Sequence, residues 1–111
     1  MADLVIWKFP VAIAPRFSIS MPTGAQILSI QVQRDRPQMW VLVNPKVRPE
    51  QRHFRVVGTG HEYPVEFFSS HRYLDTFQEQ SGRLVLHVFE DIRQTEQGQV
   101  APTDYPYQSV E

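Results

Sequence analysis

The sequence contains no cysteine, and this absence removes several kinds of chemistry. Disulfide bonds, thiolate metal sites and cysteine nucleophiles all require that residue. Long apolar runs are also missing, and none approaches the roughly 18 residues that a membrane-spanning helix needs. Residues 1–10 lack the basic segment and the long apolar segment of a signal peptide. We therefore expect a soluble protein that works in the cytoplasm.

A strong excess of either charge is missing as well. The 111 residues include 11 Lys and Arg and 12 Asp and Glu, so the formal net charge is −1. Duplex nucleic acid is bound through a basic face, and this balance argues against such a partner. A chain of this length is typical of one small domain. Its 41% hydrophobic content is sufficient for a single core.

Helical periodicity is absent, whereas alternation of apolar and polar residues recurs along the chain. In Leu28–Gln33 the alternation is strict and predicts that Leu28, Ile30 and Val32 face the core. The turn signal of residues 22–25 predicts that this strand forms a hairpin with the strand of residues 17–21. We predict an all-β fold, a small barrel or sandwich of about seven short, mainly antiparallel strands. A helix-rich fold is the weaker alternative. The expected strands cover residues 4–9, 17–21, 28–33, 39–43, 53–56, 73–78 and 84–90.

The composition changes near residue 91. Beyond it the chain is rich in Gln, Thr, Pro and Glu, and Tyr105 and Tyr107 are its main apolar features. Such a segment buries too little apolar surface to offset the entropy of ordering it. We predict a single β domain over residues 1–91 and a mobile C-terminal tail over residues 92–111. The alternative is an extended tail that docks on a neighbouring subunit or partner.

The four histidines show no spacing that is typical of metal ligands. His53 and His87 each lie within an expected strand, where a half-exposed histidine with one hydrogen bond is the commoner arrangement. A Gly-x-Ser-x-Gly elbow is absent. So are the His-x-Ser or His-x-Thr repeats of small phosphodiesterases. We predict no metal site, no cofactor and no catalytic residue.

The strongest candidate site is the segment Arg55–Pro64, in which a strand meets two glycines and a histidine. Backbone N–H groups that converge at glycines can hold a phosphate or carboxylate. Basic side chains nearby would then supply further donors. The simpler interpretation is a tight turn at the end of a strand. No helix follows as in a phosphate-binding loop. The candidate ligand-binding residues are Arg55, Gly58, Thr59, Gly60, His61 and Arg72.

Several blocks of sequence together resemble a family of small proteins of unknown function that bacteriophages and prophages encode. The resemblance covers about residues 4–90. It implies an accessory protein in the cytoplasm of an infected bacterial host, and it brings no assigned activity or site residues. The blocks that carry it include PTGAQILSIQVQ (residues 22–33), FRVVGTGH (residues 54–61) and LHVFE (residues 86–90).

From this setting we expect a non-enzymatic binding protein with a host-interaction or anti-defence role. Its partner would be a host macromolecule, such as a host protein, or a small anionic or nucleotide ligand. One alternative is a virion or assembly component that forms homo-oligomers through an edge strand. The other alternative is a small hydrolase that uses His61 with an acid such as Glu62 or Asp75. Because adjacent strand residues face opposite ways, Glu62 could assist His61 only in an irregular loop.

Overall fold

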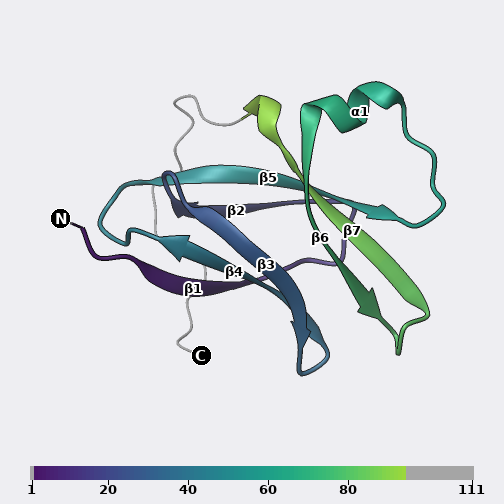
Figure 1. Cartoon of the computed structure of the whole chain (residues 1–111), viewed down its shortest axis with the longest axis horizontal. Coiled ribbons are helices and arrows are strands. Elements are labelled where there is room, and N and C mark those ends of the chain that lie inside the picture. Colours follow the sequence, from purple (N-terminus) through teal and green to yellow (C-terminus); the bar gives the residue numbers. More distant parts are fainter. Residues whose placement is uncertain (1, 95–111) are drawn as a thin grey trace.

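The computed structural model of the protein describes residues 2–94 and shows seven strands in two layers (Figure 1). One short helix, α1, follows β5, and a 3₁₀ turn, η1, follows β7. The elements in chain order are β1 (Val5–Pro10), β2 (Arg16–Pro22), β3 (Gln26–Gln33), β4 (Arg36–Val43), β5 (Pro49–Gly58), α1 (Val65–Ser70), β6 (His71–Glu79), β7 (Leu84–Asp91) and η1 (Ile92–Gln94).

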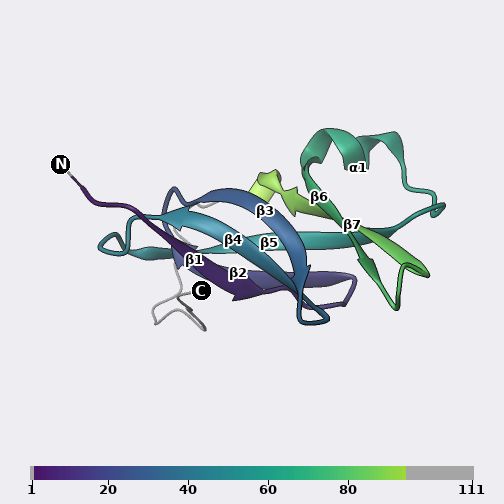
Figure 2. The ribbon, with the colours of Figure 1, turned by 60° about the horizontal axis from the view of Figure 1, so that its bottom comes forward.

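The strands form two separate antiparallel sheets. The smaller sheet has the order β1-β4-β3, and the larger has the order β2-β5-β7-β6. In Figures 1 and 2, β3 and β4 pass obliquely across β2 and β5, and α1 lies over the last part of β5, next to the start of β6. The prediction of an all-β fold with antiparallel strands is confirmed. Of the two architectures predicted, the described residues form the sandwich.

The core lies between the sheets and is built by alternate residues of the central strands. On β4, Met39, Val41 and Val43 are fully buried, whereas Trp40 and Leu42 are half-buried on the opposite face. Phe54 of β5 and Val88 of β7 close the core from the larger sheet. Burial of each such side chain stabilises the fold by about 1.5–3 kcal/mol.

The predicted hairpin between residues 17–21 and 28–33 is wrong, although its turn is present. The N–H of Ala25 donates to the carbonyl of Pro22 (3.1 Å), and Gly24 supplies a positive φ of 80°. However, β2 pairs with β5 and β3 pairs with β4. The turn therefore carries the chain from one sheet to the other. A turn signal shows where the chain reverses, and it does not determine which strands share hydrogen bonds.

The predicted inward face of residues 28–33 is only partly right. Ile30 is 1% exposed, but Leu28 and Val32 are 44% and 41% exposed. The pairing of β3 with β4 shifts register between Ile27 and Ser29, so Leu28 is the extra residue of a β-bulge. Ile27 packs against the core instead. Val32 lies close to the end of the strand, where it remains exposed.

One side of the sandwich is joined by Asp75, which lies at a register shift in β6. Its carboxylate accepts hydrogen bonds from the N–H of Ile30 in the other sheet (2.8 Å) and from the N–H of Thr76 (2.9 Å). This side chain therefore links an edge of the smaller sheet to an edge of the larger one.

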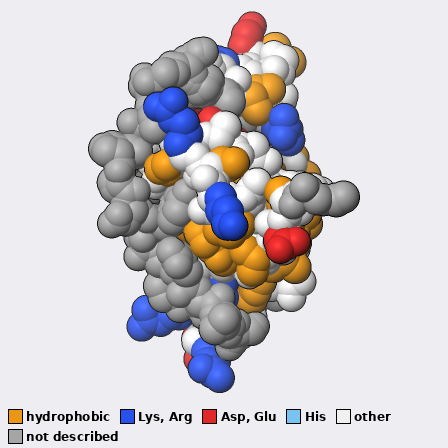
Figure 3. Space-filling model, turned by 90° about the vertical axis from the view of Figure 1, so that its left-hand side faces the viewer, with side chains coloured by type: hydrophobic (Ala, Val, Ile, Leu, Met, Phe, Trp, Pro, Cys, Tyr) orange, Lys and Arg blue, Asp and Glu red, His pale blue; other side chains and the backbone are white. Residues whose placement is uncertain are grey.

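The opposite edge of the smaller sheet is β1, whose first part is exposed. Leu4, Val5 and Ile6 all remain accessible near the start of this strand. Figure 3 views the molecule from the left-hand side of Figure 1 and shows hydrophobic side chains gathered beside both basic and acidic side chains. An exposed apolar edge strand is a site at which another chain can add.

The described residues include no helix long and apolar enough to cross a bilayer. The predicted domain limit falls at Asp91, where β7 ends, and η1 continues the described chain to Gln94. The rest of the predicted tail lies outside the described residues, so its mobility stays a prediction.

Candidate functional site

Gly58-Thr59-Gly60-His61 forms a β-turn at the end of β5. The N–H of His61 donates to the carbonyl of Gly58 (3.3 Å). Gly60 has a φ of +90°, as the third residue of a type II turn requires. The simpler interpretation of this segment, a turn that ends a strand, is therefore confirmed.

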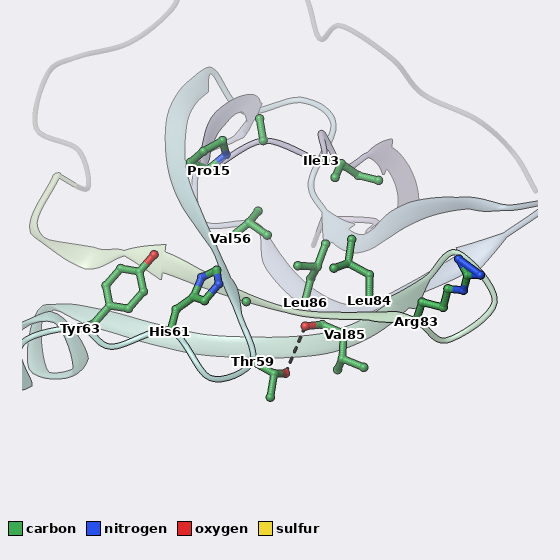
Figure 4. Close-up of a pocket in the computed structure, with 12 residues that line it drawn as sticks. Ile13, Pro15, Val56, Thr59, His61, Tyr63, Arg83, Leu84, Val85 and Leu86 are labelled. Carbon is green, nitrogen blue, oxygen red and sulfur yellow. Dashed lines mark hydrogen bonds between the residues drawn. The ribbon is translucent and has the colours of Figure 1, made fainter.

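Thr59 attaches this turn to β7. Its N–H donates to the carbonyl of Val85 (3.3 Å), and its hydroxyl donates to the same oxygen (3.2 Å, Figure 4). Both Thr59 and His61 thus use their backbone N–H groups inside the protein. Two amides of the predicted anion nest are already occupied, and the geometry favours a positional role for Thr59.

His87 extends this attachment across the outer face of the larger sheet. Its Nε2 lies 2.7 Å from the Thr59 hydroxyl, and its Nδ1 lies 2.9 Å from the Thr76 hydroxyl. Because Thr59 donates to Val85, the network assigns the proton to Nε2 of His87 and makes Nδ1 an acceptor. The hydroxyl of Tyr73 completes the chain at 2.7 Å from Thr76. The turn is therefore held by a continuous series of hydrogen bonds to β7 and β6.

The ring of His61 lies against Gly58. A Cβ atom at position 58 would be 3.0 Å from Cε1 of His61, closer than ordinary contacts allow. A side chain at position 58 would therefore displace the ring of His61 from its present position. The His61 side chain is exposed and makes no hydrogen bond within residues 2–94.

The turn forms one wall of a pocket of about 620 Å³ (Figure 4). A second wall is the connection between β1 and β2, which is anchored where the N–H of Val56 donates to the carbonyl of Pro15 (2.9 Å). The start of β7 forms the remaining wall. Most of the lining is apolar, and the lining residues are Ile13, Ala14, Pro15, Val56, Gly58, Thr59, His61, Tyr63, Arg83, Leu84, Val85 and Leu86.

The structure brings three of the six predicted site residues, Gly58, Thr59 and His61, to this pocket. Gly60 lies in the same turn but does not line the pocket. Sequence reasoning missed the segments 13–15 and 83–86, which hold apolar residues and Arg83. The only signal in the sequence was that these apolar residues lie next to predicted turns. The pocket itself forms because the fold brings distant segments together.

Arg55 lies on the outer face of β5, because its neighbour Phe54 points into the core. Its guanidinium carbon is 5.3 Å from the ring centroid of Phe67 and 6.0 Å from that of Tyr63, within cation–π range. Tyr63 lines the pocket and packs on Phe67 at 4.7 Å between centroids. Arg55 therefore supports a pocket residue without lining the pocket.

Arg72 lies away from the pocket, in the opposite half of the larger sheet. It pairs with Glu90 in the register of β6 and β7. It lines two smaller cavities of about 360 and 390 Å³, which it shares with Arg52 and Glu90. The structure does not bring Arg72 to the turn.

Arg52 and Glu90 form a buried ion pair in that half of the sandwich. Two guanidinium nitrogens of Arg52 donate to the two carboxylate oxygens of Glu90 at 2.5 and 3.0 Å. Nη1 of Arg52 also donates to the carbonyl of Ala25 (2.8 Å). Bidentate pairing of this kind compensates the removal of both charges from water.

A second ion pair follows at the end of β7. Arg93 donates to both oxygens of Asp91, at 2.9 and 2.8 Å. These side-chain hydrogen bonds outweigh the opposing effect of burial and lower the pKa of Asp91 to about 2. The buried His71 lies nearby, with its Nε2 3.8 Å from Asp91 and its ring stacked on Phe67 at 4.1 Å.

Neither acid of the hydrolase alternative lines the pocket. Asp75 uses its carboxylate to join the two sheets, and Glu62 is exposed. Within residues 2–94, no group of three His, Asp or Glu side chains is placed to hold a metal ion.

Comparison with known proteins identifies the family of the chain. No curated protein and no solved structure matches the chain. A family model described as a domain of unknown function (DUF7352) matches residues 3–99, which include every described strand. The match does not test the phage setting that the sequence resemblance implies. The chain belongs to the family of the domain of unknown function DUF7352.

Proposed function

We propose that this domain is a non-enzymatic binding protein whose ligand occupies the pocket beside the Gly58–His61 turn. The observation that carries the proposal is the pocket itself, about 620 Å³ in volume and walled mainly by apolar side chains. Ligand sites commonly have volumes of about 300–1,000 Å³, with apolar walls and a few polar groups.

The surrounding contacts support a preformed site. Thr59 is bonded to β7 at the carbonyl of Val85, and Val56 is bonded to the carbonyl of Pro15. These bonds fix the two walls that come from loops. A wall that is already ordered loses little conformational entropy when a ligand binds.

The setting of this binding follows from the sequence resemblance alone. We propose a phage-encoded accessory protein that acts in the cytoplasm of an infected host and binds a host component. A binding role is preferred to hydrolysis because His61 has no acid partner in the described part of the chain.

Titration with N-phenyl-1-naphthylamine, a neutral dye that fluoresces in apolar surroundings, tests the pocket. We expect saturable fluorescence with the native chain and loss of most of it in Leu84→Asp, because the bound dye would lose an apolar contact and remove water from the new carboxylate. Val65→Asp is the matched control, since Val65 is 76% exposed and lies on α1 outside the pocket.

Thermal melts would establish that both variants remain folded. Equal dye binding by Leu84→Asp and Val65→Asp would contradict a binding role for this pocket.

The alternative of an assembly component has one observation in its favour, the exposed apolar start of edge strand β1. If β1 pairs with a second copy, Ile6→Lys should convert an oligomer into a monomer in light scattering after size exclusion. A chain that is monomeric at all concentrations would remove this alternative.

A further inference from the structure

We infer that the ligand is a small amphipathic anion, with an apolar body in the pocket and a carboxylate or similar group beside Arg83. This inference rests on the proposed function and specifies the chemistry of its ligand. It also relocates the predicted anion contact, from the backbone amides of the turn to a side chain at the start of β7.

The first support is the charge of the pocket. Among the twelve described residues that line it, Arg83 alone carries a permanent charge, and none is Asp or Glu. The guanidinium of Arg83 makes no hydrogen bond or ion pair within residues 2–94. Arg52, by contrast, has its charge matched by Glu90. The pocket therefore presents a positive charge that no carboxylate of residues 2–94 neutralises.

The second support is the position of Arg83. The residue follows Gly82 in the turn between β6 and β7, where its N–H donates to the carbonyl of Gln80 (3.1 Å). This bond fixes the backbone from which the side chain extends. Figure 4 shows Arg83 at one side of the pocket, with Leu84 and Leu86 between it and His61. The guanidinium of Arg83 lies at the outer edge of the pocket, and its exposed side chain can reach an anionic group at the rim while the apolar body of the ligand lies against Leu84 and Leu86.

The third support is the opposite side of the pocket. His61 and Tyr63 lie together there in Figure 4, and neither side chain has a hydrogen-bond partner within residues 2–94. Their rings offer apolar faces to the ligand body, and their polar atoms can donate to a second oxygen. The side chains around the pocket thus supply donors and apolar surface but no negative charge.

Arg83 is exposed, so an ion pair between its guanidinium and a ligand carboxylate adds a modest contribution to binding. A neutral ligand with the same apolar body would gain the hydrophobic contribution only. The structure therefore predicts discrimination by charge as well as by size.

Isothermal titration with octanoate and with octanamide tests this inference, because the two probes share an apolar chain and differ in charge. We expect the native chain to bind octanoate about threefold more tightly, as an ion pair with an exposed arginine allows. Arg83→Met should bring this ratio close to one. Arg36→Met is the matched control, since Arg36 is exposed at the start of β4, outside the pocket, and should keep the native ratio.

Equal affinities for both probes in the native chain, or an unchanged ratio in Arg83→Met, would overturn the inference. So would a failure of octanoate to bind. Each of these outcomes leaves the proposed function standing if the neutral dye still binds the native chain and not Leu84→Asp. Failure of the native chain to bind the dye would instead count against the proposed function.

Discussion

β5 and β7 run the length of the larger sheet, and their inward-facing residues have different surroundings at its two ends. In one half, Arg52 and Glu90 form a buried bidentate pair, which we call the closed end. In the other half, Val56 and Leu86 line a pocket, which we call the open end. Phe54 and Val88 fill the core between them.

The two ends differ in whether their polar side chains are paired within the described part of the protein or exposed. At the closed end the guanidinium of Arg52 finds both Glu90 and the carbonyl of Ala25. At the open end the side chains of His61 and Arg83 have no partner within residues 2–94. Buried polar groups that are mutually satisfied stabilise or specify a fold, whereas donors at the rim of an apolar hollow remain free for a ligand.

The largest effect is predicted for a mutation that removes the ion pair of the closed end. Glu90→Ala should lower the free energy of unfolding by about 3 kcal/mol, because it leaves the buried charge of Arg52 with only a longer contact to Glu50 (3.9 Å) and the carbonyl of Ala25. Urea denaturation would measure the loss. The double variant Arg52→Met, Glu90→Leu should recover most of it, since it removes both charges together. A loss of under about 1 kcal/mol in Glu90→Ala would show that the pair is not desolvated.

A smaller effect on stability is predicted at the two glycines of the open end, and it should differ between them. Gly60→Ala should cost about 1–2 kcal/mol in unfolding free energy, because its φ of +90° strains any side chain. Gly58→Ala should cost less, since the ring of His61 can move away from the new methyl group. That movement should instead weaken dye binding several-fold. The reverse pattern, with Gly58→Ala the more unstable variant, would show that the His61 ring is fixed.

The smallest effect concerns the ion pair that follows the closed end. Because the pKa of Asp91 is about 2 when folded, below its ordinary 3.8, ionisation of this group favours the folded state. Its contribution is complete above about pH 4 and is lost as the pH falls towards 2. Arg93→Gln should therefore flatten the decline of the melting temperature across this interval. The effect is small, since the Arg93 side chain is 58% exposed.

For that prediction, Arg36→Gln is a suitable control on an exposed position of β4. If Arg93→Gln and the control decline equally between pH 4 and 2, Arg93 does not set the pKa of Asp91.

Strand positions could be predicted from the sequence because they depend on local patterns. Alternation in residues 17–21 and 84–90 placed two of the strands, and turn residues marked their ends. The pairing of β2 with β5 could not be predicted in this way, since no local signal specifies a partner about 30 residues away. The bulge at Leu28 likewise depends on how β3 meets β4.

The candidate site shows the same limit. The glycine–histidine turn was visible in the sequence because glycine has a local conformational meaning. The apolar walls were not, because Ile13 and Leu84 are ordinary residues until the fold brings their segments together. The place of Arg83 at the pocket could not be predicted for the same reason. Arg55 and Arg72 were predicted to bind a ligand because of their charge, but neither lines this pocket.

The most direct test of the account is a methyl NMR titration with N-phenyl-1-naphthylamine. We predict shift changes at the methyl groups of Ile13, Val56, Leu84 and Leu86, which line the open end. Leu28 at the bulge and Val65 on α1, exposed but outside this pocket, should stay unchanged. Changes confined to Leu28 or Val65, with the four pocket residues unaffected, would contradict the claim that the open end is the binding site.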